Sequence, residues 1–297
     1  MRFACDHLLV RVPATSANLG PGFDALGVAF GLWDEIEVKA VPGPTAVVVR
    51  GEGEGDLPLD ETHLVVRSAQ RALEAVGAPP IGLQLTCLNR IPRARGLGAS
   101  AAEAVAGGLI ARGLIETPGA MTAGRVYQLA TDFEGHPDAA APAVFGGATV
   151  AWQGPDGEAR AAKLSVHPAV RAVVLIPEFP VANSLARAIL PARIPHADAA
   201  FSAGRAALMV HALEHEPALL WEASQDKLHQ PYRADVMPPT FGLMKDLRAR
   251  GVPAMISGAG PSVLCLTTEP GRVPSVEGWR RLELEVATGG GTVARYE

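Results

Sequence analysis

The sequence contains little cysteine and no long apolar run, and each shortage excludes a class of protein. Cysteine occurs only three times in 297 residues, at Cys5, Cys87 and Cys265. These positions are far apart and include no C-x-x-C pair, which excludes a disulfide framework and favours a reducing compartment. The most apolar stretch, around 139–152, is interrupted by one proline and two glycines. Such a stretch is too short and too broken to span a bilayer.

Lysine is also scarce, with four residues in the chain, and the formal net charge is −5. This balance argues against a protein that binds nucleic acid or an anionic membrane. The first residues lack the apolar segment of a secretory signal, because Asp6, His7 and Arg11 interrupt them. We therefore expect a soluble, cytoplasmic protein. Hydrophobic residues make up 48% of the chain, enough for a buried core in two modest domains or one large one.

Hydrophobic periodicity predicts an α+β chain in which strands and helices follow one another. The stretches 8–15 and 35–41 alternate like half-buried strands, and 170–178 is a continuous apolar run typical of a buried strand. Helical periodicity, with glycine and proline as stop signals, predicts helices over 62–76, 99–115, 198–215, 217–228 and 238–251. A boundary near Val166 would divide the chain into two domains, 1–166 and 167–297.

The stretch Ala94–Gly107, ARGLGASAAEAVAG, is a glycine turn that leads from an expected strand into an expected helix. A helix N-terminus presents free N–H groups and the positive end of the helix dipole. Glycines let the backbone wrap closely around an anion at that point. The order of strand, GLGAS and helix therefore predicts a phosphate-binding loop, to which Ser100 adds a hydroxyl group.

Two other interpretations of this loop stay open. GLGASA also fits the dinucleotide pattern G-x-G-x-x-[GA], although that pattern normally follows the first strand of its domain. A turn of small residues that packs a helix closely against a sheet explains the loop about as well. A Walker A loop is excluded, because it needs a lysine after its second glycine and no lysine lies in a glycine loop.

Two further glycine-containing stretches could belong to a ligand site. Pro13–Gly27, PATSANLGPGFDALG, carries Asn18 and Asp24 in a tight loop that suits a small polar ligand. Taken alone, it fits a capped helix start with Asp24 as the cap better than it fits a ligand site. The stretch ISGAGPSVLCL, 256–266, is a second glycine turn between strands, and taken alone it is a simple hairpin.

The stretch FEGHPDAAAPAVFGG, 133–147, brings three ionisable groups within five residues. Glu134, His136 and Asp138 could bind Mg²⁺ through a carboxylate or assist a proton transfer. The alternative is a solvated turn, because HPD is a common turn sequence.

Taken together and in this order, the four stretches resemble the GHMP kinases, and within them the homoserine kinase family. PRARGLGASAA is similar to the ATP loop of these kinases, P-x-x-x-G-L-G-S-S-A-A, and NLGPGFDALG is similar to their N-terminal motif. EGHPDAAAPAVFGG resembles their E-G-H-P-D-N segment, and SGAGPS resembles their third motif. The segments LARAILP, DAAFSAGRAALMVHAL and DKLHQPYR resemble segments typical of homoserine kinases.

The resemblance implies an N-terminal domain of the ribosomal-S5 type and a C-terminal ferredoxin-like α/β sandwich, with the active site between them. It implies that the γ-phosphoryl group of ATP is transferred to the side-chain hydroxyl of L-homoserine in threonine biosynthesis, with Mg²⁺ as cofactor. It also implies a homodimer.

The resemblance assigns roles to particular residues. Ser100 and Glu134 would hold Mg²⁺, and Asp138 is the candidate catalytic carboxylate. Asp24 would bind the amine of homoserine, and an arginine fork matches its carboxylate. The residues implied for the carboxylate and the rest of the amino-acid pocket are Arg187, Arg233, Asn18 and His136. The residues implied for ATP are Pro92, Arg93, Ala94, Arg95, Gly96, Leu97, Gly98, Ala99, Ser100, Ala101, Ala102 and His63.

The sequence departs from the family pattern at three positions. Ala99 replaces the first of two serines in the ATP loop, and His63 stands where an asparagine near the adenine is common. Ala139 replaces an asparagine that holds the reacting hydroxyl in the family. Two alternatives to homoserine phosphorylation follow from these departures: a kinase for another small hydroxylated acceptor, and a non-catalytic nucleotide-binding relative.

Overall fold

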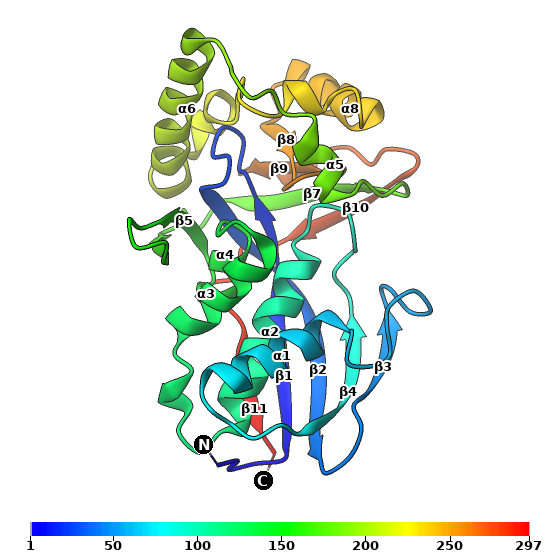
Figure 1. The fold of residues 1–297 in the computed structure, drawn as a ribbon. Helices are drawn as coiled ribbons and strands as arrows, with labels where there is room; N and C mark the ends of the chain where they lie inside the picture. The colour runs from blue at the N-terminus through cyan, green and yellow to red at the C-terminus, as the bar shows by residue number, and fades with distance from the viewer. Residues whose placement is uncertain (1, 297) are drawn as a thin grey trace.

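The computed structural model describes residues 2–296, which fold around two β-sheets (Figure 1). The first sheet has the strand order β11-β1-β2-β4-β3, and β5 and β6 extend it from β2. The second sheet has the order β10-β7-β9-β8. The predicted α+β class is confirmed.

The first sheet is built mainly from the N-terminal half of the chain. The long antiparallel pair β1 and β2 shifts register between Pro13 and Ala14, so the far end of β1 bends toward the second sheet. The strands are β1 (His7–Ala17), β2 (Leu26–Val41), β3 (Ala46–Gly51), β4 (Gly82–Asn89), β5 (Ala148–Gln153) and β6 (Ala159–Leu164).

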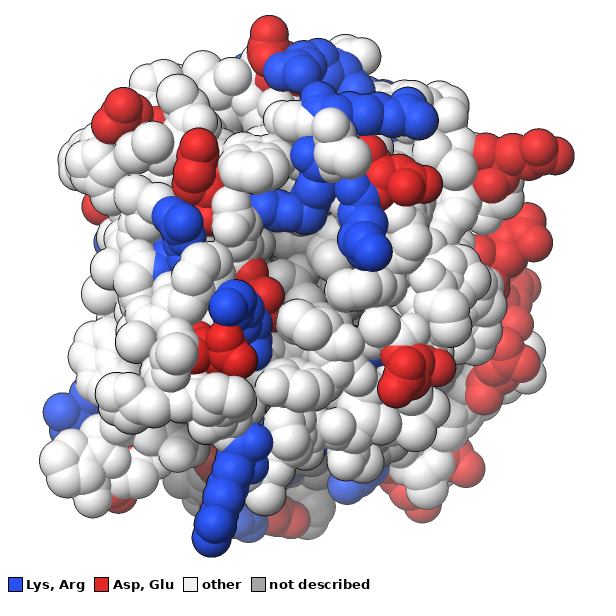
Figure 2. Space-filling view, turned by 90° about the horizontal axis from the view of Figure 1, so that it is seen from above, with Lys and Arg blue, Asp and Glu red and all other residues white. Residues whose placement is uncertain are grey.

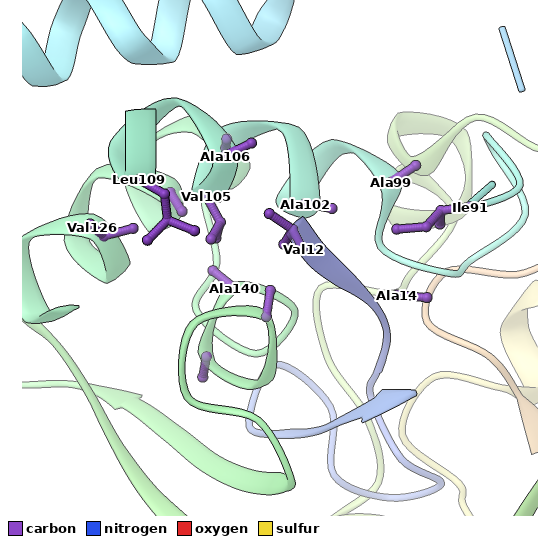
Figure 3. Close-up of a cluster of buried hydrophobic side chains, with 14 of the residues drawn as sticks. Val12, Ala14, Ile91, Ala99, Ala102, Val105, Ala106, Leu109, Val126 and Ala140 are labelled. Carbon is purple, nitrogen blue, oxygen red and sulfur yellow. The ribbon is translucent and has the colours of Figure 1, made fainter. Parts of the chain in front are cut away.

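Helices cover one face of the first sheet and form its core. α2 (Ala99–Leu114) is buried on nearly every side because small residues let β1, α1 and α3 approach it closely. Figure 3 shows Ala102 and Val105 of α2 on the side of Val12 of β1, and Leu109 of α2 near Val126 of α3. The other helices of this layer are α1 (Leu64–Ala75), α3 (Ala123–Glu134) and α4 (Ala140–Phe145).

The second sheet carries its own apolar cluster, in which Val173, Leu175 and Ile256 pack against Met244 and Leu247 of α8. Its strands are β7 (Arg171–Pro177), β8 (Ala254–Ile256), β9 (Val263–Thr267) and β10 (Trp279–Leu284). The helices are α5 (Asn183–Ala188), α6 (His196–Glu214), α7 (Leu220–Ala223) and α8 (Pro238–Ala249). α6 and α8 lie at the top of the molecule in Figure 1.

The prediction of a helix over 217–228 is wrong. The structure has a short 3-10 turn at Pro217–Leu219 and a single turn at α7, after which the helix ends. The carboxylate of Asp226 accepts hydrogen bonds from the backbone N–H groups of Leu228, His229 and Gln230 at 2.6–3.0 Å. A side chain that takes the backbone donors in this way competes with helix formation.

The chain ends in the first sheet. β11 (Thr292–Arg295) pairs antiparallel with β1, with Val293 opposite Val10. The residues after β10 therefore cross back to the N-terminal half and form a strand that the sequence analysis did not predict. The division at Val166 stays a prediction, and β11 lies on the other side of it.

No helix within 2–296 is long and apolar enough to cross a membrane. Figure 2 shows the molecule from above, where the surface is hollowed near the centre of the view and side chains of both charges, Lys or Arg and Asp or Glu, border the hollow.

Candidate active site

The predicted phosphate loop runs from the end of β4 to the start of α2, and a buried carboxylate holds its beginning. Asp34 of β2 accepts hydrogen bonds from the backbone N–H groups of Arg90 (2.6 Å) and Ile91 (2.9 Å). Burial raises the pKa of Asp34 to about 6, although these two bonds oppose the shift. The two hydrogen bonds to Asp34 fix the point at which β4 ends and the loop leaves the sheet. Sequence reasoning did not single out Asp34.

The two glycines of the loop are required by its backbone. Gly96 and Gly98 have φ angles of 69° and 72°, in the left-handed region that favours glycine. A Cβ atom on Gly98 would collide with Oγ1 of Thr15, and one on Gly96 would collide with the backbone oxygen of Ser257. Gly98 is also the N-cap of α2, and no side chain caps this helix. The first N–H groups of α2 are therefore left for another partner.

The second glycine turn, 257–262, supports the phosphate loop from the other sheet. The Ser257 hydroxyl donates to the backbone oxygen of Gly96 at 2.7 Å and lies 2.9 Å from the Ser16 hydroxyl oxygen. The backbone N–H of Gly258 donates to the oxygen of Ala17 at 3.2 Å. β1, the phosphate loop and the turn after β8 are thus joined at one place.

A cavity of about 380 Å³, here called the main cavity, lies at this junction. Residues from β1, from the phosphate loop, from the segment after α3 and from the second half of the chain share its wall. Its lining residues are Thr15, Ala17, Asn18, Pro92, Arg93, Ala94, Gly96, Leu97, Gly98, Ala99, Ser100, Glu134, His136, Ala139, Arg187, Arg233, Gly258 and Ala259. Most of the residues predicted from the sequence are therefore brought together around one space.

Ser100 and Glu134 meet in the main cavity from different helices. Ser100 lies in the first turn of α2, and Glu134 is the last residue of α3, which ends at Gly135 in the left-handed conformation. Burial raises the pKa of Glu134, and a hydrogen bond from Ser100 opposes the shift. The pair offers a hydroxyl oxygen and a carboxylate, which are ligands that Mg²⁺ accepts.

His136 and Asp138 form a second pair beside Glu134. Nδ1 of His136 lies 2.9 Å from Oδ1 of Asp138, whose side chain is fully buried. The other carboxylate oxygen accepts the backbone N–H of Asn18 at 3.3 Å. The hydrogen bond to Asp138 raises the pKa of His136. Asp138 therefore orients the imidazole while itself lying behind the cavity wall.

Asp24 and Arg187, predicted for opposite ends of an amino acid, contact one another. Nη1 and Nη2 of Arg187 donate to the two carboxylate oxygens of Asp24 at 3.0 and 2.6 Å. The Asn18 side-chain oxygen accepts the Asp24 backbone N–H at 2.8 Å, which holds Asp24 in its loop. The ion pair raises the pKa of Arg187 further. The two predicted binding groups thus neutralise each other across 163 residues of chain.

Arg233 is a buried cation in the wall of the main cavity. Its side chain is 2% exposed and donates to the backbone oxygens of Gly258 (2.9 Å) and Ala186 (3.3 Å). Burial lowers its pKa to about 10, which still leaves it charged at neutral pH. The ring of Phe23 lies close to both Arg233 and Arg187, with the guanidinium carbons 5.8 and 5.3 Å from its centroid. Phe23, which sequence reasoning missed, therefore contacts both arginines.

Six predicted residues do not line the main cavity. Asp24 and Asp138 lie one layer behind it, through Arg187 and His136. The remaining four are His63, Arg95, Ala101 and Ala102. Arg95 turns away and donates to the backbone oxygens of Pro177 and Glu178, beside a separate cavity of about 510 Å³. Ala101 and Ala102 are buried in the packing of α2.

Arg93 lines the main cavity but is not free. It forms an ion pair with Glu103, which lies one turn into α2 and is 4% exposed. Burial raises the pKa of Glu103, and the Arg93 cation opposes the shift. Glu103 is another residue that sequence reasoning missed; a carboxylate within an alanine-rich helix was the available signal.

A second cavity of about 410 Å³ lies between α6 and α8 and contains none of the predicted site residues. Trp221 and Phe241 line it, and cations lie over both rings: Arg248 over Trp221 at 5.1 Å and Lys245 over Phe241 at 6.0 Å. Arg248 is occupied by hydrogen bonds to Ser224 and to backbone oxygens. This cavity is separate from the phosphate loop.

His63 is the N-cap of α1, and its side chain is 1% exposed. Its Nδ1 accepts the backbone N–H of Val65 at 3.2 Å, and Nε2 has no protein partner. Burial lowers the pKa of His63 to about 4. Between pH 6.5 and 4 the unfolded chain therefore binds a proton that the folded chain does not, so stability falls as the pH drops through this window.

We expect His63→Asn to weaken this pH dependence, because asparagine keeps the capping oxygen but does not titrate. Between pH 7 and 5, the loss of unfolding free energy should be about 2 kcal/mol smaller in the variant than in the wild type. Urea unfolding at pH 7, 6 and 5 measures it, with exposed His215→Asn as the control. Asp34, whose raised pKa acts in the opposite direction, cancels in the comparison. Parallel curves for wild type and variant would contradict the prediction.

The comparisons with known proteins agree with this geometry. The family model of the GHMP kinases N terminal domain matches residues 63–147. The structure resembles that of homoserine kinase from Cytophaga hutchinsonii, with a TM-score of 0.81 and 25% identity over 99% of both chains. Mevalonate diphosphate decarboxylase from Staphylococcus aureus shares the fold, with a TM-score of 0.69 and 14% identity over 98% of both chains. The fold and the phosphate loop define a GHMP kinase.

Comparison with curated relatives identifies the family within the GHMP kinases to which the chain belongs. Homoserine kinase from Leifsonia xyli is 49% identical over 96% of this chain and 91% of its own length. Homoserine kinase from Streptomyces avermitilis is 45% identical over 98% of this chain and 97% of its own length. The chain belongs to the homoserine kinase family of the GHMP kinases. The predicted family, fold and enzyme class, an ATP-dependent small-molecule kinase, are confirmed.

Proposed function

We propose that this protein transfers the γ-phosphoryl group of ATP to the side-chain hydroxyl of L-homoserine, giving O-phospho-L-homoserine. The observation that carries the proposal is the wall of the main cavity. It combines the uncapped start of α2 with two arginines, Arg187 and Arg233, and Asp24 pairs with Arg187 directly behind the wall, so that charges of both signs are placed for a small zwitterion. The start of α2 suits a phosphate group, and the charged side chains suit the amine and carboxylate of an amino acid.

The residues present suit a magnesium ion. Ser100 and Glu134 offer only oxygen atoms, and the Glu134 carboxylate is held in a buried place with a raised pKa, where a cation would stabilise its charged form. We propose that these two residues hold Mg²⁺. When bound, the ion would neutralise the negative charge of the phosphate groups.

Phosphoryl transfer depends mainly on positioning and charge neutralisation, and the chain's own groups supply both. The free N–H groups at the start of α2 donate hydrogen bonds to phosphate oxygens. Asp24 binds the substrate amine, and Arg187 and Arg233 bind the carboxylate, so that binding exchanges the Asp24–Arg187 pair for contacts with the substrate. Both carboxylate oxygens of Asp138 already accept hydrogen bonds. We therefore propose that Asp138 acts through His136, which it orients toward the acceptor.

ADP release from MgATP by the purified protein tests the proposal. L-homoserine, L-serine, L-threonine, mevalonate and shikimate should be compared as acceptors. We expect a strong response to homoserine alone. A response only to another acceptor would replace the substrate but keep the kinase. ATP binding without transfer to any acceptor would favour the non-catalytic alternative, which Ala139 alone supports.

Ala139→Asn is expected to raise kcat/KM for homoserine about tenfold. Ala139 is the N-cap of α4, is 6% exposed and faces the main cavity, where its methyl group packs with Ala17 and Ala101. An amide there adds a hydrogen bond for the acceptor, worth roughly 1 kcal/mol or more. Initial rates at saturating ATP measure it, and Ala139→Val, which adds bulk without an amide, is the matched control. Equal gains in both variants would show that the amide is not the cause.

A further inference from the structure

Among the side chains that the structure describes, six buried nitrogen or oxygen atoms have no hydrogen-bond partner, and only one of them belongs to a residue that lines the main cavity. This atom is Oγ1 of Thr15, whose side chain is 1% exposed. Buried polar atoms in native proteins are nearly always paired, so an unpaired one requires an explanation. A hydroxyl that faces a ligand cavity is explained if its partner is the ligand.

The fold directs this hydroxyl at the phosphate loop. The backbone N–H of Thr15 donates to the oxygen of Leu97 at 3.0 Å, which ties β1 to the loop. Oγ1 lies so close to Gly98 that no side chain is possible at the N-cap of α2. Thr15 therefore lies beside the uncapped N–H groups that start this helix.

Strand alternation separates the roles of the neighbouring residues. From Ala14 to Ala17 the register of β1 is regular, so Thr15 and Ala17 share one face and Ser16 lies on the other. The Ser16 hydroxyl is engaged with Ser257. Ala17 packs with Ala139, at the place where the acceptor is expected. Thr15 is thus the one residue of β1 with an unpaired hydroxyl that lines the cavity, and this hydroxyl lies against the start of α2.

We propose that Thr15 is a further catalytic residue, whose hydroxyl donates a hydrogen bond to an oxygen of the terminal phosphoryl group of ATP. A neutral donor at this point adds to the N–H groups of α2 and follows the phosphoryl group as its charge develops. The inference rests on the proposed phosphoryl transfer. It assigns to β1 a contact with the nucleotide that is separate from the amino-acid contacts of Asn18 and Asp24.

Thr15→Val, which keeps the shape and removes the hydroxyl, tests the inference. We expect kcat to fall roughly 10- to 100-fold, with KM for homoserine within about twofold of wild type. Binding of the β,γ-imido analogue of ATP should weaken about tenfold, whereas binding of ADP, which lacks the terminal group, should not change. Thr15→Ser should restore both. Thr149→Val is the matched control, because Thr149 is also a fully buried, unpaired threonine in the same sheet but outside the cavity.

Each other outcome overturns the inference. Equal weakening of ADP and of the analogue would place the hydroxyl elsewhere on the nucleotide. A rise in KM for homoserine alone would place it on the acceptor. Unchanged binding and rate, or a change shared with Thr149→Val, would make it structural. The binding comparison needs no acceptor, so the inference is tested even if the wild type does not phosphorylate homoserine.

Discussion

Glu134→Gln is expected to lower kcat by about 1,000-fold while leaving the fold intact. The side chain keeps its size and its hydrogen bond with Ser100, but it loses the charge that would hold Mg²⁺. Removing one fixed electrostatic contact to a transition state typically costs about 100- to 1,000-fold, and a metal ligand is at the upper end. The rate should be measured over a series of Mg²⁺ concentrations, where the half-saturating concentration should rise.

The neighbouring residue Asp132 provides the control for Glu134. Asp132 lies on the same helix, is exposed and accepts a hydrogen bond from Gln128 at 2.7 Å. Asp132→Asn removes a carboxylate two residues away and should leave kcat within about twofold, as for most surface changes. If Glu134→Gln retained normal kcat and magnesium dependence, Ser100 and Glu134 would not be the metal site.

Asp24→Asn is expected to raise KM for homoserine about 100-fold and to leave KM for ATP within twofold. The carboxylate is the group proposed for the substrate amine, and hydrogen bonds to charged groups are worth about 1.5–3 kcal/mol. The Asn18 contact to the Asp24 backbone does not depend on the side chain, so the loop should stay in place. Initial rates with each substrate varied in turn measure the effect.

Arg187→Lys provides the comparison for Asp24. Lysine keeps the positive charge but loses the two-pronged contact that Arg187 makes with both oxygens of Asp24. Its effect on KM for homoserine should be smaller, roughly tenfold. An unchanged KM for homoserine in Asp24→Asn would contradict the assignment of the amine site. A parallel rise in KM for ATP would show that the N-terminal loop had been displaced.

Parts of this site could be predicted because they depend on residues close together in the sequence. The phosphate loop is a strand, two glycines with positive φ and a helix of small residues, and each of these features is local. The resemblance to homoserine kinases likewise rests on short motifs. Glu134, His136 and Asp138 follow one helix end directly, so their proximity was readable from their spacing.

Other parts depend on contacts between distant segments. The pairing of Asp24 with Arg187 and the burial of Arg233 arise only when α5 and the second glycine turn pack against the loop that carries Asp24. The turn that follows α7 is held by the side chain of Asp226, which accepts nearby backbone N–H groups where the sequence pattern indicated a helix. Periodicity describes one segment at a time and contains no information about which side chain another segment will meet.

The sequence by itself determined the family, the phosphate loop and the set of polar residues that the site contains. The tertiary structure decided which of these residues line the cavity and which lie one layer behind it. It placed Thr15 among the residues that line the cavity. It also placed the last strand in the first sheet. The physical reason is that motif spacing and turn chemistry act over a few residues, whereas the direction of a side chain across a junction is set by the packing of two sheets.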